Sequence, residues 1–108
     1  MSLEEFERLI IATAERSAIC ELVTVVAFTE TTIRLSVLLY IDAHIDIYFN
    51  ERNGITSYTL VASDVRVFGA DNANGWRFHP FGAPDHHEWL SQPMTFAEFL
   101  EQVEQEYS

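Results

Sequence analysis

The sequence predicts an α+β domain in which an antiparallel sheet is flanked along the chain by two helices. Three observations support this fold class. A stripe of apolar side chains at helical spacing occupies each end of the chain, while the middle contains short runs that alternate apolar and polar residues. The connections between those runs are too short for crossover helices, so consecutive strands must pair antiparallel. We therefore expect one domain over residues 1–108, with a five- or six-stranded meander and both helices packed on one face of the sheet.

The first helix is predicted over residues 3–17. Ser2 and Glu5 form the S-x-x-E pattern of a capping box, in which each side chain bonds the backbone N–H of the other residue. Side chains that could face a core then recur at helical spacing, at Leu3, Phe6, Leu9, Ile10 and Thr13. Cys20 stands where the helix gives way to a strand, and as a lone cysteine it is expected to be a small buried hydrophobe.

Short runs rich in β-branched residues predict the strands of the meander. The first two runs, L-V-T-V-V-A-F and I-R-L-S-V-L-L-Y, flank a polar turn at residues 29–32 and form a hairpin. A third run, residues 45–49, follows His44, which we expect to be half-exposed on the polar face. Asn53-Gly54 is a strong turn signal, and I-T-S-Y-T-L-V and V-R-V-F beyond it supply a fourth and a fifth strand.

The second helix is predicted to begin just after Pro93. Thr95 and Glu98 form a second capping box, and apolar side chains follow at helical spacing. That stripe consists of Phe96, Phe99, Leu100 and Val103. The two helices are the only segments available to cover one face of the meander.

The charge of the chain is strongly acidic, with 17 Asp and Glu residues against six arginines and no lysine, a formal net charge of −11. Such a field repels polyanions, so general nucleic-acid binding is disfavoured and only a local basic patch would permit it. A basic partner protein would match the charge. The absence of a long apolar run, together with an acidic M-S-L-E-E start, leads us to expect a cytoplasmic protein that does not associate with membranes.

The densest set of reactive side chains lies in residues 71–88, D-N-A-N-G-W-R-F-H-P-F-G-A-P-D-H-H-E. A connection of this length between a strand and a helix is more often functional than structureless. W-R-F-H within it could form a sixth short strand, with Trp76 and Phe78 on the core face and Arg77 and His79 side by side on the other.

The remainder of this segment is expected to bend the chain back on itself. Pro80, Gly82 and Pro84 favour such a return, which would bring His86 or His87 near His79. Adjacent histidines cannot both face one side, so one member of the pair at most should approach. Asn72 and Asn74 are expected to satisfy turns rather than to take part in chemistry.

These residue types favour acid–base chemistry. His79 and either His86 or His87 would exchange protons, Arg77 would stabilise a charged transition state, and Asp71 would orient a histidine. Cleavage of RNA by its own 2′-hydroxyl fits this set and needs neither a metal nor a cofactor.

Two alternatives remain open for the same segment. A metal site could form from His79, His86 or His87 and Asp85, although the spacing H-x6-H-H matches none of the usual zinc patterns and ranks lower. The other alternative is a non-catalytic, dimeric protein-interaction module. Its apolar anchors would be Trp76, Phe81 and Trp89.

The last half of the chain resembles the TumE-like toxin family. The resemblance rests on V-F-G-A-D-N-A at residues 67–73, W-R-F-H-P-F-G-A-P-D-H-H-E-W at 76–89 and the closing helix P-M-T-F-A-E-F-L-E-Q-V at 93–103. Members are small prokaryotic proteins, many of them toxins encoded beside a helix-turn-helix antitoxin. The resemblance implies a toxin-like component of a toxin–antitoxin module, an antitoxin protein as partner, and RNA as the substrate. A homodimer is expected instead from the alternative interaction module.

Overall fold

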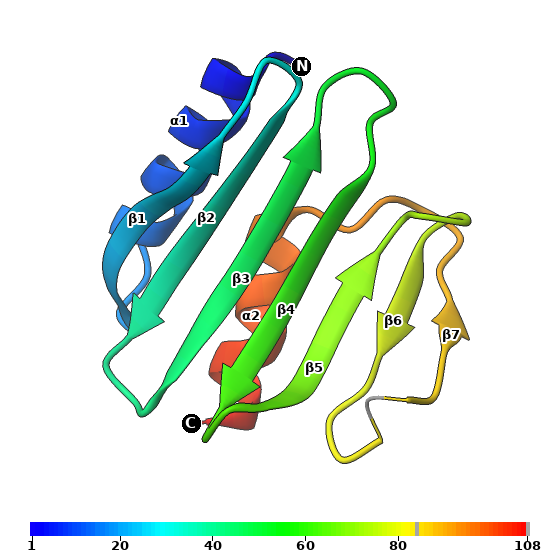
Figure 1. Ribbon diagram of the computed structural model, residues 1–108. Helices are drawn as coiled ribbons and strands as arrows, with labels where there is room; N and C mark the ends of the chain where they lie inside the picture. Colours follow the sequence, from blue (N-terminus) through cyan, green and yellow to red (C-terminus); the bar gives the residue numbers. More distant parts are fainter. Residues whose placement is uncertain (84, 108) are drawn as a thin grey trace.

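The computed structural model describes residues 1–83 and 85–107 and has the predicted α+β architecture (Figure 1). Its two helices enclose seven strands along the chain rather than five or six, because Arg77–His79 forms the sixth strand and a two-residue strand follows it. In chain order the elements are α1 (Leu3–Glu15), β1 (Cys20–Phe28), β2 (Thr32–Leu39), β3 (Ala43–Asn50), β4 (Thr56–Ala62), β5 (Val65–Asp71), β6 (Arg77–His79), β7 (Glu88–Trp89) and α2 (Phe96–Glu106).

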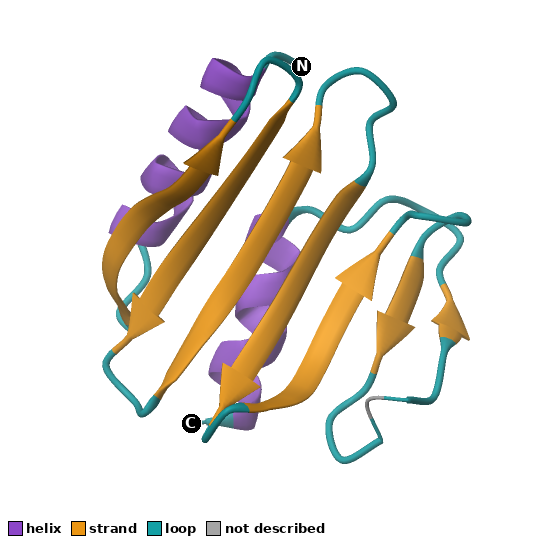
Figure 2. Cartoon of the chain, in the orientation of Figure 1, coloured by secondary structure: helices purple, strands orange, loops and turns teal. Residues whose placement is uncertain are grey.

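The strands form one sheet in the order β1-β2-β3-β4-β5-β6-β7, with every neighbouring pair antiparallel. This is the predicted meander, in which each strand pairs with the next one in the sequence. Both helices lie against the same face of the sheet, behind the strands in Figure 2. We call the opposite side, which no helix covers, the open face.

Both helices begin at the predicted capping boxes. Ser2 and Glu5 cap α1 reciprocally, and Thr95 and Glu98 cap α2 in the same way. The first helix ends at Glu15, two residues earlier than expected, because the N–H groups after it bond to Thr13 and Ala14 in a tight final turn. No helix within the described residues is long and apolar enough to cross a membrane.

The core lies between the helices and the covered face of the sheet. The predicted alternation is confirmed in β2 and β3, where every second side chain is buried. The aromatic part of the core is centred on Phe68 of β5, whose ring contacts Phe78, Phe81 and Phe99 at centroid distances of 4.9, 4.4 and 4.6 Å. The helical stripes are also buried, at Leu3, Phe6, Ile10, Thr13, Phe96, Phe99, Leu100 and Val103, whereas Leu9 is exposed.

The first strand is an edge strand with an unusually apolar surface. Leu22, Val25, Val26 and Phe28 are all exposed. Cys20 begins this strand and is half-buried, and burial raises the pKa of its thiol. A thiol that is harder to ionise is less nucleophilic, which agrees with a packing role for Cys20.

Candidate functional site

The register of β5 and β6 places three of the predicted site residues on the open face. Asp71 pairs with Arg77, and Gly69 pairs with His79, while Ala70 between them and Phe68 before them are buried on the helix side. Because side chains alternate along a strand, Asp71, Arg77 and His79 emerge on the same side. The predicted side-by-side placement of Arg77 and His79 on a short strand is confirmed.

The aromatic residues of the same segment lie on the helix side, as expected. Phe78 contacts the ring of Phe68 edge-on, and Trp76 lies 6.2 Å from Tyr58, centroid to centroid. These contacts fix the orientation of β6, because a one-residue slip would bury Arg77 and expose Phe78.

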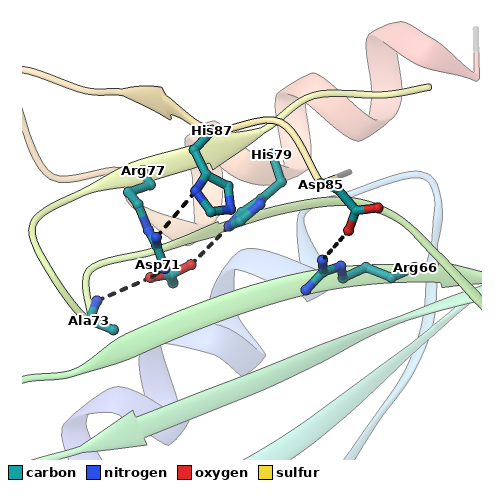
Figure 3. Close-up of polar contacts among 7 residues, drawn as sticks. All are labelled: Arg66, Asp71, Ala73, Arg77, His79, Asp85 and His87. Carbon is teal, nitrogen blue, oxygen red and sulfur yellow. Dashed lines mark hydrogen bonds and ion pairs between the residues drawn. The ribbon is translucent and has the colours of Figure 1, made fainter. Parts of the chain in front are cut away.

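Asp71 is the centre of the cluster (Figure 3). Its Oδ1 accepts hydrogen bonds from the backbone N–H of Ala73 at 3.1 Å and from Nη2 of Arg77 at 3.4 Å. Its Oδ2 lies 3.0 Å from Nε2 of His79. A carboxylate can only accept, so Nε2 of His79 must carry a proton. Asp71 therefore sets the tautomer of His79 as well as its position.

His87 completes the cluster from the returning chain. The chain turns at Gly82, whose φ of 78° is in the left-handed region that suits glycine. The ring of His87 then meets the ring of His79 in a T-shaped contact with a centroid distance of 4.5 Å, and its Nδ1 lies 3.3 Å from Nη1 of Arg77 (Figure 3). A guanidinium can only donate, so in this arrangement Nδ1 of His87 is unprotonated.

The electrostatics of the cluster favour an ionised Asp71 and a neutral His87. Burial acts to raise the pKa of Asp71, but the hydrogen bonds from His79 and Ala73 and the charge of Arg77 outweigh it and lower that pKa. Loss of water beside the cluster lowers the pKa of His87, and the charge of Arg77 lowers it further. The exposed imidazole is thus held in its basic form near neutral pH.

The four side chains of the cluster differ in their exposure to solvent. The side chains of His79, Asp71 and Arg77 are 7%, 17% and 20% exposed, while His87 is exposed. Gly69 lies beside His79, but a Cβ at that position would be 3.8 Å from Cδ2 of the imidazole, an ordinary contact. The close approach that the glycine allows is to the carbonyl oxygen of Tyr58, 3.2 Å from such a Cβ.

Two of the histidine-segment residues lie apart from the cluster. His86 is exposed, and in the described part of the chain its side chain makes no hydrogen bond or ion pair, so His87 is the partner of His79. Asp85 pairs with Arg66 at 3.5 Å. The expected bend at Pro80 and Gly82 is present, whereas Pro84 lies outside the described residues.

The metal alternative is not supported by the positions of its proposed ligands. Within residues 1–83 and 85–107, no three His, Cys, Asp or Glu side chains come together in a way that could hold a metal ion. Asp85 in particular bonds to Arg66 rather than approaching His79.

His44 lies on the third strand, as expected, and is half-exposed. Its Nε2 lies 3.3 Å from Oδ1 of Asp46.

Asn72 has a structural role, as predicted, but its side chain bonds to a neighbouring hairpin rather than to its own turn. Its Oδ1 accepts from the backbone N–H of Thr56 at 2.6 Å and its Nδ2 donates to the carbonyl of Gly54 at 3.0 Å. These bonds tie the end of β5 to the hairpin between β3 and β4. The roles of the Ala73 N–H and of Gly69 were not predicted, although a glycine inside a strand is a known signal of close approach.

The aromatic anchors of the alternative interaction module differ in exposure. Phe81 stacks on Phe68 and Trp76 packs against the core, so neither offers a free ring to a partner. Trp89 is 67% exposed.

No protein-family model, no curated protein and no solved structure matches the chain. Membership of the TumE-like family therefore rests on the resemblance of residues 67–103 and stays a prediction.

Proposed function

We propose that the protein cleaves RNA without a metal, by histidine acid–base chemistry, as the toxin-like component of a toxin–antitoxin module. The observation that carries the catalytic part is the Asp71–His79–Arg77–His87 cluster on the open face, with one exposed imidazole kept neutral beside a guanidinium. The toxin–antitoxin setting, with an antitoxin protein as partner, comes from the sequence resemblance.

The reaction follows from the roles of these groups. His87 accepts the proton of an RNA 2′-hydroxyl while the 2′-oxygen attacks the adjacent phosphorus. The bond from phosphorus to the 5′-oxygen breaks, and that oxygen takes a proton from Nδ1 of a doubly protonated His79, while the Nε2–H of His79 stays hydrogen-bonded to Asp71. The products are a 2′,3′-cyclic phosphate and a free 5′-hydroxyl. Because the two imidazole rings touch, the phosphate would lie beside them rather than between them.

Arg77 links substrate binding to activation of the base. In the free protein, Nη1 of Arg77 is hydrogen-bonded to Nδ1 of His87. Nε of Arg77 is buried and has no hydrogen-bond partner among the described residues. A phosphate offers stronger acceptors than an imidazole nitrogen. A guanidinium that turns toward the phosphate would release Nδ1 of His87 to accept a proton, and would stabilise the charge that develops on the phosphate oxygens.

The test compares cleavage of one RNA by three purified proteins: wild type, His87→Ala and His44→Ala. His44 lies on the same open face outside the cluster and serves as the matched control. We expect His87→Ala to slow cleavage by at least about 100-fold, the lower end of the contribution of general acid–base catalysis, and His44→Ala to match wild type. The reaction should persist in EDTA and yield a 2′,3′-cyclic phosphate. Equal cleavage by His87→Ala, or cleavage of an all-2′-deoxy analogue, would refute the mechanism.

A second candidate function is the dimeric interaction module, which the apolar edge strand favours. Leu22, Val26 and Phe28 are exposed on β1, and its outer edge has no strand beside it. Glu21 is the only charged residue in this strand. Each copy of the chain carries a formal net charge of −11, so two copies repel each other. The repulsion is smallest where few charged side chains lie, which favours contact through the outer edge of β1.

Mass in solution over a range of concentrations tests this second candidate. We expect a dimer in which β1 pairs with β1 of a second copy, and Val26→Lys should dissociate it by placing a charge in the pairing edge. Val65→Lys makes the same change at an equally exposed valine of β5 and should leave the dimer intact. A wild-type protein that stays monomeric at every concentration would exclude this module.

A further inference from the structure

We propose that a groove on the open face beside the cluster binds single-stranded RNA and delivers it to His87. The inference rests on the proposed function, because it names the surface that would hold the substrate of that site. The groove has a volume of about 500 Å³, and the polar residues that line it are Arg34, Asp46, Tyr48, Ser57, Thr59 and Arg66.

The register of the sheet places the groove directly next to the cluster. One cross-strand row runs Arg34, Tyr48, Ser57, Asp71, Arg77, each residue paired with the next. A second row runs Ser36, Asp46, Thr59, Gly69, His79. The groove is lined by residues of β1 to β5, and the cluster lies on β5, β6 and the returning chain, so a ligand that follows the first row passes from one to the other.

The length of this path suits a short single strand. Arg34 and Arg77 are separated by four strand spacings of about 4.8 Å each, or about 19 Å across the sheet. A single-stranded RNA that crosses the sheet along this row can therefore contact an arginine at each end of the row. Arg66 lines the groove from the start of β5, outside this row, and its link to Asp85 joins the rim of the groove to the segment that carries His87.

The far end of the groove offers a stacking platform. The guanidinium of Arg34 lies over the ring of Tyr48, 4.7 Å from its centroid. RNA bases that are not paired stack on arginine and aromatic planes, which tolerate any base. A cation–π pair that is already assembled costs little further ordering when a base joins it.

The distribution of charge explains how an acidic protein could accept a polyanion here. Eight of the 17 acidic residues lie on α1 and α2, on the other side of the sheet. Three of the six arginines, Arg34, Arg66 and Arg77, lie on the open face. The same face also carries Asp46, which lines the groove, and Asp71, so its arginines make the open face less acidic than the helix side without making it basic.

Binding is tested with an RNA of about ten nucleotides whose riboses are all 2′-O-methylated, a length within the site sizes of single-strand binders. The modification blocks attack, so fluorescence anisotropy reports binding alone. We compare wild type, Arg34→Gln and Arg8→Gln. Arg8 lies on α1, so its replacement makes the same change in net charge on the opposite side of the molecule. Thermal unfolding of each variant checks that it is folded.

We expect Arg34→Gln to weaken binding at least about fivefold, which corresponds to about 1 kcal/mol, the lower end for stacking of one base. Arg8→Gln should bind within about twofold of wild type, since surface charges far from a ligand act weakly through salt. If Arg34→Gln and Arg8→Gln bind alike, or if a duplex RNA binds as tightly as the single strand, the groove assignment is wrong.

Two further measurements separate the groove from the chemistry. His87→Ala should lose less affinity for the methylated RNA than Arg34→Gln does, because Arg34 lines the groove and His87 does not. Loss of binding in Arg34→Gln together with undiminished cleavage by His87→Ala would leave the groove standing and refute the proposed catalysis. Cleavage that depends on His87 but has the same KM in Arg34→Gln would leave the catalysis standing and overturn the groove.

Discussion

Replacement of Asp71 by asparagine is the sharpest test of the cluster as a charge-stabilised unit. Asparagine keeps one oxygen for Ala73 and Arg77 but puts an amide where Oδ2 accepts from His79 at 3.0 Å. The substitution also removes the negative charge between Arg77 and His79. We expect Asp71→Asn to fold with a lower free energy of unfolding.

The size of the loss follows from the number and exposure of the bonds. One charge-assisted bond, to His79, is lost outright, and the bond from Arg77 becomes weaker. A hydrogen bond to a charged group contributes about 1.5–3 kcal/mol, and the 17% exposure of the Asp71 side chain places the loss toward the lower end. We therefore expect about 2 kcal/mol at pH 7, or a fall in Tm of roughly 8 °C for a chain of this size.

The difference in unfolding free energy between wild type and Asp71→Asn should depend on pH, and this dependence tests whether the charge of Asp71 is responsible. The folded-state pKa of Asp71 lies below its ordinary value of 3.8, so its stabilising contribution is complete above that value and is lost as the pH falls through the lowered pKa. Once protonated, the aspartic acid is neutral, as asparagine is. Urea unfolding of wild type and Asp71→Asn should therefore differ by about 2 kcal/mol at pH 7, and the difference should shrink as the pH falls below 3.8.

Asp85→Asn is the matched control, because it makes the same change at a side chain that is 100% exposed. Its unfolding free energy should stay within about 0.5 kcal/mol of wild type at pH 7 and at pH 3. A loss for Asp71→Asn that is no larger than this, or that is the same at pH 7 and at pH 3, would show that the charge of Asp71 does not stabilise the cluster.

Two further predictions follow from contacts elsewhere in the cluster and at the helix ends. Arg77→Gln should raise the pKa of His87 in an NMR titration, because it removes a positive charge 3.3 Å from Nδ1; an unchanged or lower pKa would contradict the tautomer assigned to His87. Ser2→Ala and Thr95→Ala should each lower the unfolding free energy by about 1 kcal/mol through loss of a capping box, measured by urea unfolding, and a double variant should lose close to the sum.

Periodicity and turn chemistry predicted most of the fold. Two local signals identified elements correctly. They are the two capping boxes and the alternation of apolar residues at Ile33, Leu35, Val37 and Leu39, and the tertiary structure agrees with both. The seventh strand was not predictable, because Glu88 and Trp89 are too few for a period. They pair with Phe78 and Arg77 only because the chain returns alongside β6.

For the candidate site, alternation along W-R-F-H predicted which side chains share a face. It could not choose between His86 and His87, since that depends on how the chain turns back after His79. Nor could it show that the carboxylate of Asp71 reaches both Arg77 and His79, because their proximity comes from the register of β5 against β6. Which side chains meet was predictable within a strand and not across strands.

The strictly sequential pairing of the strands has a consequence for how the molecule forms. Each hairpin of the sheet joins neighbours in sequence, so the sheet can grow from β1 to β7 without closing a long loop, which favours fast folding. The exceptions are the contacts of α2, such as the hydrogen bond from Ser17 Oγ to Glu104 at 2.7 Å. The helix whose Phe99 contacts Phe68 follows β1 to β7 in the sequence, so these strands are synthesised before it. Until that helix docks, Phe68 lacks one of its three aromatic contacts, and the face of the sheet that the helix covers is open to association with another protein.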